Sequence, residues 1–125
     1  MKVNEIMNKV MAVESDINLK QAAKILSDKN IGSLVVLKKD KILGIITERD
    51  IIDNISSLGG KISSIMSKVV VTIDHNDSID NAALIMAQNK IKRLPVVDKE
   101  KLVGIVTATD IIANSDILNE DFFFD

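Results

Sequence analysis

The strongest constraint on this chain is a duplication inside it. The stretch Ile42–Ile52, ILGIITERDII, returns as Leu102–Ile112, LVGIVTATDII, 60 positions further on. Over the longer ranges 31–52 and 91–112, 11 of 22 aligned positions are identical. Self-similarity at a fixed period indicates one structural unit that is present twice. We therefore expect two copies of the same fold unit.

The length of the chain bears on how the two copies are arranged. With 125 residues, each copy holds about half the chain. A unit of roughly 60 residues buries only about 60% of its unfolded surface and is marginal alone. We expect the copies to share a core as one module, packed about a pseudo-twofold axis. The predicted limits are 1–58 for the first repeat, 61–118 for the second and 119–125 for a C-terminal tail, with a linker at Gly59-Gly60.

Each copy has a helix with recognisable ends. The helix starts after a good N-cap, Asn18 in the first copy and Ser78 in the second, and Gln21 completes a capping box in the first. Apolar residues then recur at the spacing of one helix face. We expect the helices to end near Asn30 and Lys90.

Short apolar runs predict the strands around these helices. A first strand is clearest in the second copy, where Val69–Ile73 is β-branched throughout. The later strand pairs are predicted at Leu34–Leu37 with Ile42–Ile46, and at Leu94–Val97 with Leu102–Val106. A second helix follows each pair. The predicted fold class is therefore mixed α/β (α+β), built from two β-α-β-β-α repeats.

Charge and residue types argue against several kinds of function. The 16 basic and 18 acidic residues give a net charge of −2, so nothing indicates the basic face that nucleic acid requires. There is no cysteine, and the only histidine, His75, lies in a polar loop, so we predict no metal site. No signal peptide or membrane-spanning run is present, which predicts a cytoplasmic protein with no membrane partner.

The candidate functional residues lie where the repeated strand ends, in TERD and TATD. Thr47 and Asp50, and likewise Thr107 and Asp110, are three positions apart. A Thr at the N-cap and an acidic residue at the third helical position stabilise a helix start. The same carboxylate can also accept hydrogen bonds from both hydroxyls of a ribose, as an acidic residue does in dinucleotide sites. These two roles are compatible.

The repeat ending also includes a glycine three positions before each threonine. Gly44 and Gly104 leave the strand without a side chain at this point. We expect that this lets a flat base approach the strand.

These residues carry a resemblance to a known family. The endings GIITERD and GIVTATD and the segment IKRLPVV resemble the cystathionine-β-synthase (CBS) domain, over about residues 2–115. A tandem pair of such domains is called a Bateman module, and the resemblance implies a stand-alone prokaryotic protein of this kind. Members bind adenosine-containing ligands (AMP, ADP, ATP, S-adenosylmethionine, sometimes NAD) in clefts between the repeats. Flat homodimers are common among them, and we therefore expect this chain to form a homodimer.

The resemblance also implies two sites, each shared between the repeats. One would use Thr107 and Asp110 with Met11, Ala12, Val13, Ile31 and Gly32. The other would use Thr47 and Asp50 with Val71, Thr72, Ile73, Ile91 and Lys92. Arg49, Lys92 and Arg93 are the cations that we expect to face phosphate. Since Gly32-Ser33 stands where the second repeat has Lys92-Arg93, we expect the two sites to be unequal.

Two functions stay open at this point. The first is a regulatory, ligand-sensing module that binds an adenine nucleotide, AMP or ATP, and catalyses no reaction. The second is a protein-interaction adaptor whose ligand clefts are vestigial, and the apolar tail Phe122–Phe124 favours it, because we expect these side chains to pack on the domain or on a second subunit. An enzyme is the third idea, but the usual nucleophile and acid–base sets are missing. The regulated protein partner is not indicated.

Overall fold

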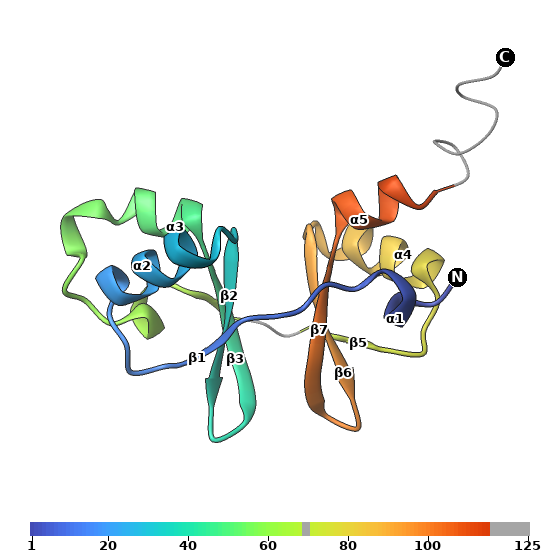
Figure 1. The fold of residues 1–125 in the computed structure, drawn as a ribbon, viewed down its shortest axis with the longest axis horizontal. Coiled ribbons are helices and arrows are strands. Elements are labelled where there is room, and N and C mark those ends of the chain that lie inside the picture. Colours follow the sequence, from blue (N-terminus) through green and yellow to red (C-terminus); the bar gives the residue numbers. More distant parts are fainter. Residues whose placement is uncertain (69–70, 116–125) are drawn as a thin grey trace, which may run out of the picture. The chain divides into compact units, whose positions relative to one another are not determined.

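The computed structural model describes residues 1–68 and 71–115, which form two compact units. Val10–Val70 make up one, called here the first-repeat unit. Met1–Lys9 together with the chain from Val71 onward make up the other, called here the second-repeat unit. The opening segment of the chain therefore packs with the second repeat (Figure 1). The sequence limits 1–58 and 61–118 follow the repeat and stay predictions.

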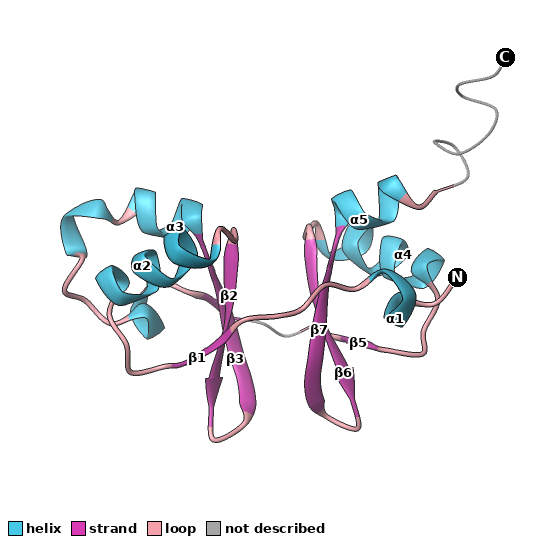
Figure 2. Cartoon of the chain, viewed as in Figure 1, coloured by secondary structure: helices cyan, strands magenta, loops and turns pink. Residues whose placement is uncertain are grey.

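The first-repeat unit has a four-stranded sheet in the order β1-β2-β3-β4. Strand β1 runs parallel to β2, and the remaining pairs are antiparallel. The two helices lie on one face of this sheet (Figure 2). The bounds are β1 Ala12–Glu14, α2 Leu19–Lys29, β2 Ser33–Lys38, β3 Lys41–Thr47, α3 Glu48–Asp53 and β4 Ser67–Lys68, with short 3-10 turns at Ile55–Ser57 and Ile62–Ser64.

The second-repeat unit has the sheet order β5-β6-β7, with β5 parallel to β6 and β7 antiparallel to it. Its bounds are α1 Val3–Ile6, β5 Ile73–Asp74, α4 Ile79–Asn89, β6 Arg93–Asp98, β7 Lys101–Thr107 and α5 Ala108–Ala113. Helix α1 comes from the start of the chain, and its Val3 side chain is fully buried in this unit's core. The predicted mixed α/β class, with the β-α-β-β-α order in each repeat, is confirmed.

Hydrophobic side chains from the helices and the central strands form a separate core in each unit. The fully or nearly fully buried members in the first-repeat unit include Leu19 and Leu26 of α2, Leu34 of β2 and Ile46 of β3. Those in the second-repeat unit include Ala82 and Met86 of α4, Leu94 of β6 and Val106 of β7. These are the positions where the apolar periodicity of the repeat predicts one buried face.

The predicted helix ends are confirmed. Asn18 and Gln21 exchange the two hydrogen bonds of a capping box, while Ser78 only accepts from a backbone N–H of α4. Both helices end on a residue in the left-handed region, Asn30 with φ 53° and Lys90 with φ 54°. A left-handed residue at the C-terminus lets backbone N–H groups return to the last free carbonyls.

The predicted strand at Val69–Ile73 differs from the structure. Residues 69 and 70 lie outside the described part, residues 71 and 72 are not in a strand, and β5 begins only at Ile73. In the first repeat, the Val35 N–H donates to the Met11 carbonyl and extends the pairing of β1 with β2. Pro95 stands at the position of Val35 and has no N–H to donate, so the equivalent pairing cannot form.

Candidate functional site

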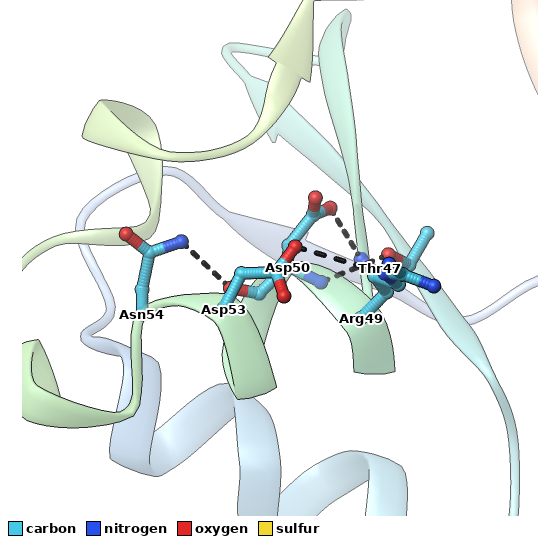
Figure 3. Close-up of polar contacts among 5 residues, drawn as sticks. All are labelled: Thr47, Arg49, Asp50, Asp53 and Asn54. Atoms are coloured by element: carbon cyan, nitrogen blue, oxygen red, sulfur yellow. Dashed lines mark hydrogen bonds and ion pairs between the residues drawn. The ribbon is translucent and has the colours of Figure 1, made fainter.

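In the first-repeat unit, Thr47 and Asp50 form the start of α3 (Figure 3). The Thr47 N–H donates to Asp50 Oδ2 at 2.9 Å, and the Asp50 N–H donates to Thr47 Oγ1 at 3.2 Å. Asn54 adds a third contact, because its Nδ2 donates to the Asp50 carbonyl at 2.8 Å. The predicted capping role is confirmed, and both Thr47 and Asp50 remain partly exposed.

The second-repeat unit repeats this arrangement with two additions. Thr107 and Asp110 exchange the same pair of capping bonds, and Asn114 donates to the Asp110 carbonyl at 2.8 Å. The Thr107 hydroxyl (Oγ1) also donates a hydrogen bond to Asp110 Oδ2 at 2.8 Å. In addition, Asn8 Nδ2 donates to the same Oδ2 at 2.8 Å. The two carboxylates therefore have different surroundings.

The loop before each central strand lies beside the capping residues of its own unit. The Gly32 carbonyl accepts from the Glu48 N–H at 3.1 Å, and the Lys92 carbonyl accepts from the Ala108 N–H at 2.9 Å. These bonds satisfy the first free N–H of each short helix. The loop backbone and the Thr–Asp pair are thus held together as one local structure in each repeat.

The predicted cations differ in their surroundings. Arg49 lies 3.7 Å from Asp53, one turn along α3, and 86% of its side chain is exposed. An exposed pair of this kind contributes little to stability, so the guanidinium can turn to another anion at small cost. Lys92 is exposed, and Arg93 is partly buried at the start of β6.

The site residues predicted from the sequence are divided between the two units. The first-repeat unit holds Met11, Ala12, Val13, Ile31, Gly32, Thr47, Arg49 and Asp50. The second-repeat unit holds Val71, Thr72, Ile73, Ile91, Lys92, Arg93, Thr107 and Asp110. Within each unit the loop and the Thr–Asp pair are neighbours. The sharing of each site between the repeats stays a prediction.

Sequence reasoning missed three asparagines. Asn54 and Asn114 stand at the same position of the two repeats, and this identity was the signal that could have identified them. Asn8 gave no such signal, because the equivalent residue of the second opening segment is Ser67.

The two repeat glycines make room for the chain itself. A Cβ added to Gly44 would lie 2.5 Å from the Ser67 carbonyl oxygen and 2.9 Å from Met66 Sδ. A Cβ on Gly104 would lie 2.7 Å from Met7 Sδ. On the side where a Cβ would point, the space is therefore filled by the opening segment of a repeat. The expectation that these glycines clear the strand for a flat base is not supported on that side.

Within 1–68 and 71–115, no group of three or more His, Cys, Asp or Glu side chains could hold a metal ion. His75 lies 3.3 Å from Asp98 Oδ1 in the second-repeat unit. Over the same ranges, no helix is long and apolar enough to cross a membrane. The predicted contacts of Phe122–Phe124 fall outside the described part of the chain.

Comparison with known sequences finds relatives that match most of this chain. The chain is 34% identical over 113 residues to the uncharacterized protein MJ1232 of Methanocaldococcus jannaschii, a match that spans 89% of this chain and 38% of that protein. It is 36% identical over 108 residues to an inosine-5'-monophosphate dehydrogenase of Thermoplasma acidophilum, spanning 86% of this chain and 22% of the enzyme. The chain thus spans well under half of either relative.

Comparison with solved structures gives a similar result. The CBS domain pair of protein MJ0100, solved in complex with 5'-methylthioadenosine and S-adenosyl-L-methionine, matches with a TM-score of 0.80 and 34% identity. That match covers 90% of this chain and 98% of the solved one. The sequence model of the CBS domain matches twice, at residues 3–57 and 62–116. With two matches that cover most of its length, this chain belongs to the CBS domain family, as a tandem pair.

Proposed function

We propose that this chain is a regulatory module that senses an adenosine-containing small molecule and catalyses no reaction on it. The observation that carries the proposal is the Thr–Asp pair present at the same position of both repeats, with its carboxylate partly exposed. Support comes from the MJ0100 domain pair, which is 34% identical and was solved with two adenosine derivatives.

The chemistry of the site fits a ribose. A carboxylate oxygen accepts hydrogen bonds well, and the two adjacent hydroxyls of a ribose supply two donors. Asp50 and Asp110 are the proposed ribose ligands, and the neighbouring threonines would contact ribose or phosphate. Among the cations, exposed Arg49 and Lys92 favour a ligand with phosphate, which is why we propose AMP or ATP. The other residues predicted from the sequence would hold the base through backbone and apolar contacts.

A purely regulatory role also agrees with the residue inventory. The whole sequence has no cysteine and one histidine. General acid–base and nucleophilic catalysis depend most often on such side chains. The match to an inosine-5'-monophosphate dehydrogenase covers only 22% of that enzyme, so its activity does not transfer to this chain.

Titration calorimetry with AMP, ADP, ATP, S-adenosylmethionine and 5'-methylthioadenosine tests the proposal. We expect binding of at least one of them and a rise in melting temperature, because a ligand that binds only the native state stabilises it by about 2.7 kcal/mol at 100 times its Kd. GMP is the matched control for the base. No heat and no change in melting temperature with any of the five ligands would contradict the sensor and favour the adaptor.

We also propose that the chain forms a homodimer. Ile52 of α3 and Ile112 of α5 stand at equivalent positions and are 68% and 57% exposed. Beside Ile52, the surface between α2 and α3 forms a groove of about 410 Å³. Apolar side chains on the same helix face of both repeats are expected to be covered by a second subunit.

Light scattering measures the mass of the particle in solution directly. We expect twice the chain mass for the wild type and a single chain for the double variant Ile52→Asp, Ile112→Asp. The control is Leu84→Asp, at an exposed leucine of α4 whose equivalent in the first repeat is Lys24. A monomeric wild type at 100 μM would count against the dimer.

A further inference from the structure

The carboxylates of Asp50 and Asp110 share the two backbone capping contacts, but Asp110 accepts two further hydrogen bonds, one of them from Asn8. Asp110 Oδ2 accepts three hydrogen bonds: from the Thr107 N–H at 2.9 Å, from Thr107 Oγ1 at 2.8 Å and from Asn8 Nδ2 at 2.8 Å. Asp50 Oδ2 accepts from the Thr47 N–H at 2.9 Å. Within the described residues, this backbone N–H is the only donor found on the Asp50 carboxylate. Figure 3 shows the contact between Thr47 and Asp50.

The contact with Asn8 follows from one position of the backbone register. Asn8 pairs with Ile105 through two backbone hydrogen bonds, of 2.8 and 3.1 Å. In the first-repeat unit the equivalent pair is Ser67 with Ile45. The asparagine side chain is one heavy atom longer than serine and ends in an amide with two donors. At this register position asparagine reaches the carboxylate beside it, and no side-chain bond from Ser67 is found in the described structure.

We propose that Asn8 occupies the Asp110 carboxylate and thereby biases adenosine ligands toward Asp50. This inference rests on the proposed function and adds which site is favoured and why. A ribose diol brings two donors to a carboxylate that offers about four acceptor positions. Asp110 Oδ2 already accepts three hydrogen bonds, so a diol that uses both carboxylate oxygens must displace one of these donors, and the Asn8 amide is the one that is not part of the helix cap. Asp50 requires no such displacement, and Asn8 is a positioning residue that acts through Asp110.

The test examines Asp50 and Asp110 one at a time, each in a variant in which the other is replaced by the uncharged asparagine. In an Asp50→Asn background, AMP binding depends on Asp110, and we expect the added change Asn8→Ser to raise the AMP affinity about five- to tenfold. This is the size of one hydrogen bond that no longer has to be broken. The reverse pair is the matched control: in an Asp110→Asn background, Ser67→Asn is expected to lower the AMP affinity by a similar factor. Calorimetry gives the affinities, and thermal melting checks that each variant is folded.

A second probe is 2'-deoxy-AMP, which lacks one of the two ribose hydroxyls. It distinguishes an effect on the hydrogen bonds between the ribose and Asp110 from a general effect on the protein structure. A gain for AMP that is absent for 2'-deoxy-AMP supports the inference, and Asn8→Ala gives a second variant with the same expectation. An equal gain for both nucleotides, no gain, or weaker AMP binding overturns it. If the wild type binds other adenosine ligands but not AMP, this inference fails alone. If it binds none of them, the proposed function fails as well.

Discussion

Asp50→Asn is expected to lower the affinity of the chain for AMP by about 10- to 100-fold while leaving it folded. In the proposed complex the variant would lose a pair of hydrogen bonds between ribose hydroxyls and a charged acceptor, and such bonds are the stronger class. Asparagine has nearly the same shape as aspartate, and its side-chain oxygen can still accept from the Thr47 N–H. The start of α3 is therefore preserved, and the change in unfolding free energy should stay below about 1 kcal/mol.

Two neighbouring carboxylates provide matched controls for this variant. Glu48→Gln and Asp53→Asn remove one negative charge each from the same short helix, and neither side chain caps it. Both should bind AMP within about twofold of the wild type, apart from a small effect of Asp53 on its partner Arg49. Calorimetry measures the affinities and urea unfolding measures the stability. If Asp50→Asn binds AMP as tightly as these controls, the carboxylate only caps α3.

The local features of this fold could be predicted from the sequence because neighbouring residues determine them. The capping box of Asn18 and the helix ends at Asn30 and Lys90 depend on side chains within a few positions of one another. The duplication strengthened these predictions, since each pattern occurs twice. The same holds for the Thr–Asp pairs at the start of α3 and α5, whose capping geometry the structure reproduces in both repeats.

Contacts between distant parts of the chain could not be predicted in this way. Asn8 donates to a carboxylate 102 positions away, and its own sequence neighbourhood contains nothing that indicates the contact. The short β5 likewise depends on Pro95 in another strand, which withholds the N–H that the apolar run before β5 would need. β-propensity describes a segment, whereas a strand also requires a partner with free donors.

The repeat glycines provide the second large effect. Gly44→Ala is expected to lower the unfolding free energy by about 2–3 kcal/mol, because the added Cβ would lie 2.5 Å from a backbone oxygen of Ser67 in β4. A backbone atom cannot rotate away, so β4 would have to move from its place beside β3. Gly104→Ala should cost less, about 1–2 kcal/mol, since the atom nearest to the added Cβ is the sulfur of a flexible methionine, Met7, and the backbone oxygen of Asn8 lies further away, at 3.0 Å.

Gly59→Ala is the control for these two variants, because a Cβ there meets nothing within 4 Å. It should be neutral or stabilising by up to about 1 kcal/mol, through the reduced freedom of the unfolded chain. Urea unfolding of the three variants is expected to give the order Gly59→Ala, Gly104→Ala, Gly44→Ala from most to least stable. A Gly44→Ala protein as stable as Gly59→Ala would show that β4 does not pack against Gly44 in solution. The glycine would then be free for another role in the strand, including the contact with a base that the sequence alone suggests.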